Sequence, residues 1–237
     1  MGGGTDAFTI ALPTDEDLDA AAEAWTRGYS GVELPQGSVW YRIVSAASSS
    51  DATRFATECY ASPALNRFTP LCRGGAIVPA AYAATAEDTA LWEVVLRGIR
   101  HAGVRRVPVA ATRDRYLCEV ELNRPIRALD ICRPRDSHLI VAGKRAPDLT
   151  AAWPAAYDVT RGWAQALFER LPGLEAICYE SHQIAGRCVV FFPPGSEVVF
   201  DLRGKPLPVN EDPVRSASVA LARMAGAVID FGDDVDD

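Results

Sequence analysis

The stretch AIVPAAYAATAEDTALWEVVLRGIR, residues 76–100, decides the fold class, because a strand pattern passes directly into a helix pattern. Residues 76–83 are almost entirely apolar and predict a buried strand. Thr85 and Asp88 form a variant of the capping box, so we expect a helix from there to about Arg100. The apolar residues on one face of this helix are Leu91, Val94, Val95 and Ile99.

Strand and helix patterns also occur on both sides of this stretch, without regular alternation. The sequence contains no GxGxxG, GxxxxGKS or GxxxxGKT motif, which argues against a Rossmann domain or a P-loop. The mixture predicts an α+β fold, with an irregular region over 133–155. The strand patterns cover residues 38–45, 115–122, 126–130, 175–181, 187–192 and 197–202. The helix patterns cover residues 12–24, 51–58 and 157–171, and Asp212-Pro213 opens a last helix with proline in its first position.

Composition and charge indicate a globular protein that does not bind nucleic acid directly. Hydrophobic residues make up 49% of the 237 residues. The chain has 24 Lys and Arg residues against 31 Asp and Glu residues, a formal net charge of −7, whereas nucleic-acid-binding proteins carry basic patches. The apolar runs are too short to cross a membrane, and the first residues lack the pattern of a secretory signal. We therefore expect a cytoplasmic protein without membrane contact.

The cysteines and histidines do not predict a metal site. The six cysteines include no CxxC pair, and the three histidines are scattered along the chain. Several cysteines lie in apolar strand patterns, where free thiols usually act as small core residues. We therefore expect reduced, structural cysteines.

A set of short segments carries polar and aromatic residues at expected strand ends, in a turn and on the central helix. These segments are Tyr41-Arg42, Asn66-Arg67-Phe68-Thr69-Pro70, Ala81-Tyr82, Thr89-Ala90-Leu91-Trp92-Glu93, residues 124–130 and Tyr179-Glu180-Ser181. Each is a weak motif alone, but their order and spacing together are much more specific. Over roughly residues 38 to 195 the chain resembles the RES-domain family.

The resemblance implies an ADP-ribosyltransferase-like fold, with a split β-sheet core and peripheral helices. It implies an enzyme that degrades NAD⁺ by cleaving the nicotinamide–ribose bond, through phosphorolysis or hydrolysis. NAD⁺ is then a substrate and inorganic phosphate a co-substrate, and no prosthetic group is expected. Many family members are toxins, so a small helical antitoxin is the implied partner. We expect a leader and short segment over 1–25, a single catalytic domain over 26–229 and an acidic tail over 230–237.

Glu93 and Arg42 each allow two interpretations. The resemblance implies that Glu93 is catalytic, since a carboxylate stabilises an oxocarbenium-like ribose. From the helical pattern alone, Glu93 lies opposite the apolar stripe and Arg97 follows four residues on, which fits a surface ion pair. Arg42 shares its strand face with Trp40 and Val44, so we expect it to be partly buried and to need an anion. That anion is either a phosphate of NAD⁺ or a carboxylate in a structural salt bridge.

Arg67, Tyr82 and Ser181 complete the predicted site. The resemblance implies that Arg67 takes part in catalysis and binds NAD⁺, although loop arginines are mostly solvated. Tyr82 ends an apolar strand and either packs in the core or lines the nicotinamide pocket. Ser181 either forms a turn or serves the site through a hydrogen bond to ribose or phosphate. We do not expect Ser181 to be a nucleophile, because a Gly-x-Ser-x-Gly motif is missing, and His182 stands where similar sequences often have arginine.

The sequence leaves two other functions open. A mono-ADP-ribosyltransferase that modifies a protein would use the same pocket. A non-catalytic binding module would fit the interpretation of Glu93 as a surface residue.

Overall fold

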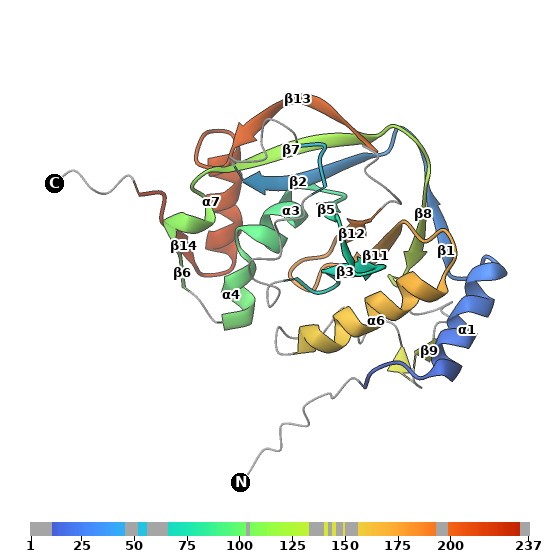
Figure 1. The fold of residues 1–237 in the computed structure, drawn as a ribbon. Coiled ribbons are helices and arrows are strands. Elements are labelled where there is room, and N and C mark those ends of the chain that lie inside the picture. Colours follow the sequence, from blue (N-terminus) through green and yellow to red (C-terminus); the bar gives the residue numbers. More distant parts are fainter. Residues whose placement is uncertain are drawn as a thin grey trace, which may run out of the picture.

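A large curled sheet forms the centre of the protein in the computed structural model (Figure 1). The structure describes residues 11–45, 52–55, 66–102, 105–132, 140–141, 144–145, 149, 156–192 and 199–232. Eight strands pair in the order β1-β8-β11-β12-β5-β2-β7-β13. These strands are β1 (Gly31–Leu34), β2 (Val39–Ser45), β5 (Ala81–Ala84), β7 (Arg115–Leu122), β8 (Ile126–Asp130), β11 (Ala176–Glu180), β12 (Arg187–Phe191) and β13 (Phe200–Pro208).

The sheet is split at its centre. Strands β2 and β5 are joined through a single residue pair, Tyr41 with Ala84, whereas β2 follows β7 from Val39 to Ser45. On the other side of the junction, β11 pairs with β12 along its whole length and runs parallel to β8. Because so few bonds cross the junction, the two halves turn relative to each other, as Figure 1 shows. This confirms the expected α+β fold with a split sheet.

Helices and short hairpins surround the sheet. None of the described helices has the length and apolar character that a membrane span requires. The helices are α1 (Asp15–Thr26), α3 (Glu87–Val94), α4 (Arg97–Ala102), α6 (Tyr157–Arg170) and α7 (Val214–Met224), with a 3-10 turn η3 (Val109–Ala111). The remaining strand pairs are β3 (Leu71–Arg73) with β4 (Ala76–Val78), β6 (Arg106–Val107) with β14 (Val228–Ile229), and β9 (Ile140–Val141) with β10 (Lys144–Arg145).

Alternation along the strands divides the apolar residues between two cores, one on each face of the sheet. The first core lies between the sheet and the helices, and it contains Leu91 of α3, Trp163 of α6 and Tyr179 of β11. The second core covers the opposite face and is built from strand residues and neighbouring loop positions, such as Trp40 and Phe191. Each strand residue is therefore assigned to a face by its position, which decides which side chains can reach the helices.

The deciding stretch over 76–100 folds into more pieces than the sequence predicts. The expected strand over 76–83 is interrupted at Pro79, so that β4 pairs with β3 in a hairpin while β5 enters the sheet. The predicted cap at Thr85 is wrong, because its hydroxyl donates to the carbonyl of Arg187 at 3.3 Å and the N-cap of α3 is Ala86.

The helix expected from there to about Arg100 is divided in two. Helix α3 ends at Val94, and α4 begins at Arg97. Between them the Leu96 N–H donates to the carbonyl of Leu91 at 3.0 Å, five residues back, which widens the turn and ends the first helix.

Other predicted boundaries hold or shift by a few residues. The strands at 38–45, 115–122, 126–130, 175–181 and 187–192 and the helix at 157–171 match β2, β7, β8, β11, β12 and α6 closely. The strand predicted at 197–202 corresponds to β13, which begins at Phe200, and the last helix uses Pro213 as its N-cap rather than its first residue. The short strands β9 and β10 lie in the region expected to be irregular. Of the helix expected at 51–58, only 52–55 are described, and they form a turn and a bend.

Helix α1 is anchored to the fold by Trp25. This side chain is 0% exposed, its indole N–H donates to the carbonyl of Pro172 at 3.0 Å, and the guanidinium of Arg127 lies 4.2 Å from the centre of its ring. Figure 1 shows α1 beside α6. Helix α1 is thereby tied to the loop after α6 and to strand β8.

We predict that Trp25→Ala lowers the free energy of unfolding by about 3–5 kcal/mol, because it removes a fully buried indole and leaves a cavity. Urea denaturation measures the change. Met224→Ala is the control: this side chain is 82% exposed, so we expect a change within about 0.5 kcal/mol. A loss below about 1 kcal/mol for Trp25→Ala would show that α1 is not an integral part of the fold.

Candidate functional site

Glu93 and Ser181 meet where α3 passes the end of strand β11. The Ser181 hydroxyl donates to Oε1 of Glu93 at 2.6 Å. The same hydroxyl accepts the backbone N–H groups of Gln183 at 3.1 Å and Ile184 at 3.3 Å. Ser181 therefore shapes the turn after β11 and at the same time orients the carboxylate. The role of a turn residue, considered from the sequence, is seen, and the hydrogen bond to ribose or phosphate stays a prediction.

A close approach of the β11–β12 turn to α3 makes this bond possible. Gly186 lies against Thr89, one helical turn before Glu93, and a Cβ atom at Gly186 would come within 2.2 Å of the Thr89 hydroxyl. The carbonyl of Gly186 also accepts the N–H of Ser181 at 2.9 Å. Only glycine lets the turn pack this closely, so Gly186 sets the distance between Glu93 and Ser181.

Arg67 brings a buried positive charge to the same side of the sheet. Its side chain is 5% exposed, and its guanidinium carbon lies 5.5 Å, 5.7 Å and 6.0 Å from the ring centres of Tyr179, Tyr157 and Phe68. Its Nε and Nη1 atoms are buried without a hydrogen-bond partner among the described residues. Stacking on aromatic rings offsets part of the cost of burying a guanidinium, but its N–H groups still require an acceptor. The site is therefore built to receive an anion or a polar ligand group.

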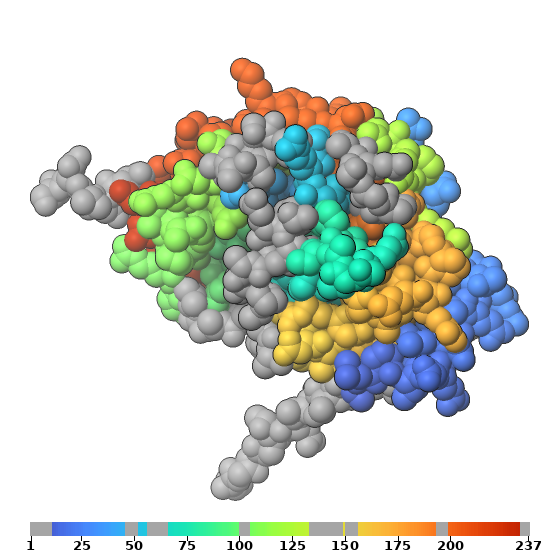
Figure 2. All heavy atoms as spheres, in the orientation of Figure 1, coloured from blue at the N-terminus to red at the C-terminus, as the bar shows by residue number. Residues whose placement is uncertain are grey.

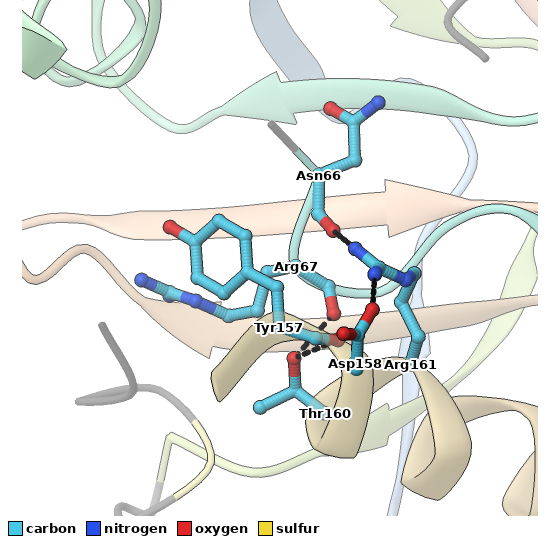
Figure 3. A network of polar contacts seen from close by, with 6 residues as sticks. All are labelled: Asn66, Arg67, Tyr157, Asp158, Thr160 and Arg161. Atoms are coloured by element: carbon cyan, nitrogen blue, oxygen red, sulfur yellow. Dashed lines mark hydrogen bonds and ion pairs between the residues drawn. The ribbon is translucent and has the colours of Figure 1, made fainter. Parts of the chain in front are cut away.

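Helix α6 fixes the turn that carries Arg67. The Thr160 hydroxyl donates to the backbone carbonyl of Arg67 at 2.6 Å, and Nη1 of Arg161 donates to the carbonyl of Asn66 at 3.0 Å. Asp158 forms an ion pair with Arg161 from the same helix. Figure 3 shows the side chains of Arg67 and Tyr157 extending to one side of the turn, away from the Asp158–Arg161 pair. The backbone of the turn is thus held rigidly while the guanidinium points into the site.

Tyr82 of β5 holds the same turn from the sheet. Its hydroxyl accepts the N–H of Phe68 at 3.3 Å and shares a hydrogen bond of 3.1 Å with the Thr69 hydroxyl. Burial raises the pKa of Tyr82 to about 12, although these hydrogen bonds and the positive charges of Arg97 and Arg67 oppose the rise. The phenol is therefore neutral at physiological pH, and both guanidinium groups act on its hydroxyl.

Glu93 and Arg67 act on the same buried side chains of the sheet. Burial raises the pKa of Tyr179, the charge of Glu93 adds to the rise, and the charge of Arg67 opposes it. Burial also raises the pKa of the Cys188 thiol, and again the charge of Glu93 adds to the rise and the charge of Arg67 opposes it. The carboxylate and the guanidinium therefore lie on the helix side of the sheet, around Tyr179 and Cys188.

Arg97 is engaged differently from the surface ion pair that its spacing predicts. Its Nη2 donates to the hydroxyl of Tyr157 at 2.6 Å, and its guanidinium carbon lies 5.4 Å from the centre of the same ring. The carboxylate of Glu93 instead accepts from Ser181. The bond to Tyr157 joins the start of α4 to the start of α6.

Arg42 is not brought together with the other four predicted site residues. It pairs in register with Cys118 and faces the second core, beyond the sheet from α3. It is buried, as expected, and donates to the carbonyl oxygens of Ala52 and, at 3.3 Å, Arg54. Its guanidinium carbon also lies 5.3 Å from the ring centre of Phe200. These contacts join β2 to residues 52–54, and the sheet separates Arg42 from Glu93.

Tyr157, Thr160 and Arg97 are parts of the site that the sequence did not reveal. Tyr157 and Thr160 lie on a helix whose pattern indicates only an apolar face, and Arg97 fits an ordinary ion-pair spacing. The short form of α3 and the docking of α6 against the Arg67 turn bring them together, and neither contact leaves a local pattern.

The RES domain matches residues 39–210, which is most of the chain. The protein therefore belongs to the RES-domain family. A chain from the crystal structure of the M. tuberculosis MbcT–MbcA toxin–antitoxin complex has a similar fold, with a TM-score of 0.51. The similarity covers 90% of this chain and 98% of that chain at 16% sequence identity. A comparison with curated proteins finds no match.

We predict that Gly186→Ala lowers the free energy of unfolding by about 1–3 kcal/mol, because the added methyl overpacks the contact with Thr89. The double variant with Thr89→Ala should recover part of the loss, since only the Cβ of residue 89, at 3.1 Å, then stays close. Urea denaturation of the four proteins in this cycle measures the coupling.

Gly31→Ala is the matched control, because a Cβ there meets the Trp25 ring at an ordinary 3.4 Å. Equal stabilities of the Gly186→Ala and Gly31→Ala variants would contradict a close contact between the β11–β12 turn and α3.

Proposed function

We propose that the protein is an NAD⁺-degrading enzyme that cleaves the bond between nicotinamide and ribose. One observation carries the proposal: Ser181 orients a carboxylate, Glu93, on the side of the sheet where a buried guanidinium, Arg67, has unused N–H groups among aromatic rings. A dinucleotide offers a ribose that develops positive charge, phosphates for an arginine and flat rings for aromatic side chains. Membership of the RES-domain family supports the same reaction class.

The reaction needs stabilisation of positive charge on the ribose more than it needs an acid. The C1′–N bond breaks, its electron pair leaves with nicotinamide as a neutral molecule, and the ribose becomes oxocarbenium-like, as in glycoside hydrolysis. An oxygen of phosphate then forms the new bond to C1′, or water does so with loss of a proton. The products are ADP-ribose phosphate in the first case and ADP-ribose in the second.

Glu93 has the charge and the fixed position that this step requires. Ser181 donates to Oε1 of Glu93, and the hydroxyl is itself held by two backbone N–H groups. A preorganised carboxylate stabilises the developing positive charge without reorganising during the reaction. Ser181 is then a positioning residue whose proton is committed to Glu93.

In this proposal Arg67 and Tyr82 bind and position the substrate. The N–H groups of Arg67 would bind a phosphate oxygen in the strong, charge-assisted manner of guanidinium groups. Tyr82 holds the Arg67 turn through Phe68 and Thr69. Its ring, half-buried at the junction of the sheet, provides an aromatic surface for the nicotinamide.

The biological role that we propose is that of a cytoplasmic toxin held in check by a small helical antitoxin. Two observations support it: the family, and the likeness in fold to a chain of a toxin–antitoxin complex. A partner that covers the Glu93 site would inhibit the enzyme by excluding NAD⁺.

We predict that Glu93→Gln lowers kcat by about 10²–10³-fold, since the charge is lost while the side chain keeps its shape. The fold should survive, because the amide oxygen of glutamine still accepts from Ser181. NAD⁺ consumption by the purified variant measures the loss, and thermal unfolding checks the fold.

Glu180→Gln is the control, an exposed carboxylate that immediately precedes Ser181. Its turnover should equal that of the unmodified protein. Unchanged NAD⁺ consumption in Glu93→Gln would overturn the proposed function. Label from NAD⁺ on a protein, instead of free ADP-ribose or its phosphate, would reassign the enzyme as a mono-ADP-ribosyltransferase.

A second prediction concerns Arg67→Met, which keeps an unbranched chain against the three rings but removes the charge. We expect KM for NAD⁺ to rise about 10–100-fold with a smaller change in kcat, because the phosphate contact forms already in the substrate complex. Initial-rate kinetics separate the two constants. Arg73→Met, on strand β3 after the same turn, should keep the KM of the unmodified protein. An unchanged KM in Arg67→Met would remove Arg67 from substrate binding.

A further inference from the structure

Two guanidinium groups share one tyrosine ring beside the Glu93 site. The carbon of Arg67 lies 5.7 Å and that of Arg97 5.4 Å from the centre of the Tyr157 ring. Both positive charges also act on the hydroxyl of Tyr82. The two groups come from separate parts of the chain, a turn before the β3–β4 hairpin and the first residue of α4, so no local pattern places them together.

Two acids of the neighbouring helices, Glu93 of α3 and Asp158 of α6, have partners other than these arginines. Glu93 accepts the hydrogen bond of Ser181. Asp158 pairs with Arg161 on the far side of the turn, as Figure 3 shows. The acceptor of Arg97 is the hydroxyl of Tyr157, and the Nε and Nη1 atoms of Arg67 have no acceptor among the described residues. Two like charges repel each other, and an anion placed between them removes that repulsion.

We propose that Arg67 and Arg97 together form a two-arginine anion site for a phosphate group, with Tyr157 as the positioning residue that orients Arg97. The inference deepens the proposed function and rests on it for the identity of the ligands. The shared chemistry is a phosphate, either the pyrophosphate of the dinucleotide or the inorganic phosphate that accepts the ribose. Arg97 follows Glu93 by four residues in the chain, across the break between α3 and α4.

The two arginines differ in how far they are exposed to solvent. The β3–β4 hairpin lies at the surface beside α6 in Figure 2, and Cys72 and Gln165 join them by two hydrogen bonds of 2.7 Å and 2.8 Å. Arg97 is half-buried beside Tyr157 at the start of α6, whereas Arg67 is buried, with 5% of its surface exposed. A phosphate would therefore reach Arg97 from solvent and Arg67 from within.

Anion binding can be tested without any turnover. Thermal unfolding of the full chain is followed in a phosphate-free buffer while inorganic phosphate or inorganic pyrophosphate is added. A ligand that binds only the folded state raises the Tm, because it stabilises that state by RT ln(1 + [L]/Kd). We expect the unmodified protein to show this rise and Arg97→Gln to bind the same anion about tenfold more weakly, as loss of one charge-assisted contact implies. Arg67→Met should bind as weakly or more so.

Two further variants make the outcome specific. Arg203→Gln removes an exposed charge that pairs with Glu119 on strand β7, and it should bind the anions like the unmodified protein. Tyr157→Phe keeps the ring but frees the guanidinium of Arg97, so it should weaken binding by less than Arg97→Gln. If Arg97→Gln does not fold, Tyr157→Phe and Arg97→Lys carry the test, and binding by both as tight as in the unmodified protein overturns the proposal.

The source of the phosphate is separated by adding ADP-ribose. If ADP-ribose and inorganic phosphate compete, the two arginines bind the pyrophosphate of the dinucleotide. If their effects on the Tm add, the arginines bind the phosphate acceptor. Equal anion binding by the unmodified protein and Arg97→Gln overturns the two-arginine site, even if NAD⁺ is cleaved. Anion binding lost in Arg97→Gln without any NAD⁺ cleavage supports the anion site and overturns only the proposed reaction.

Discussion

The guanidinium of Arg67 is buried among three aromatic rings, and much of the structure around it serves to keep it there. Removing a charged group from water costs several kcal/mol unless it is paired or bound by polar partners. Stacking on Phe68, Tyr157 and Tyr179 offsets a part of that cost. The remaining cost is offset by the stability of the fold. Thr160 holds the turn that carries Arg67 from one side, and Tyr82 holds it from the other. A ligand phosphate would supply the acceptors that the protein does not.

The split of the sheet and the close packing of one turn place a carboxylate on the same side of the sheet as this charge. Strand β5 leads from the junction into α3, and β11 ends where α3 passes, so Glu93 and Ser181 meet although 88 positions separate them in the chain. The contact of Gly186 with Thr89 sets how closely the two elements approach. Functional side chains therefore come from a turn, a strand, a short helix and a hairpin, all on the face of the sheet that the helices cover.

The sequence predicts the fold class and most strands because apolar alternation and turn residues are local signals. It also indicates four residues that the structure places on one side of the sheet, Arg67, Tyr82, Glu93 and Ser181. They could be found because the order of the short family motifs is specific even though each motif alone is weak. Arg42 was grouped with them by its motif. Side chains alternate between the two faces along β2, however, and Arg42 lies on the other face of the sheet. Tyr157 and the use of Arg97 were not predictable, since they depend on the break after Val94 and on the docking of α6.

The central claim is that this site breaks the nicotinamide–ribose bond of NAD⁺. The most direct measurement is NAD⁺ consumption by the purified unmodified protein, with and without inorganic phosphate, with the products identified by mass spectrometry. The account predicts release of nicotinamide together with ADP-ribose phosphate when phosphate is present, or ADP-ribose when water is the acceptor. Intact NAD⁺ under both conditions, in protein whose cooperative thermal unfolding shows it to be folded, would contradict the account and leave the site a binding site without this chemistry.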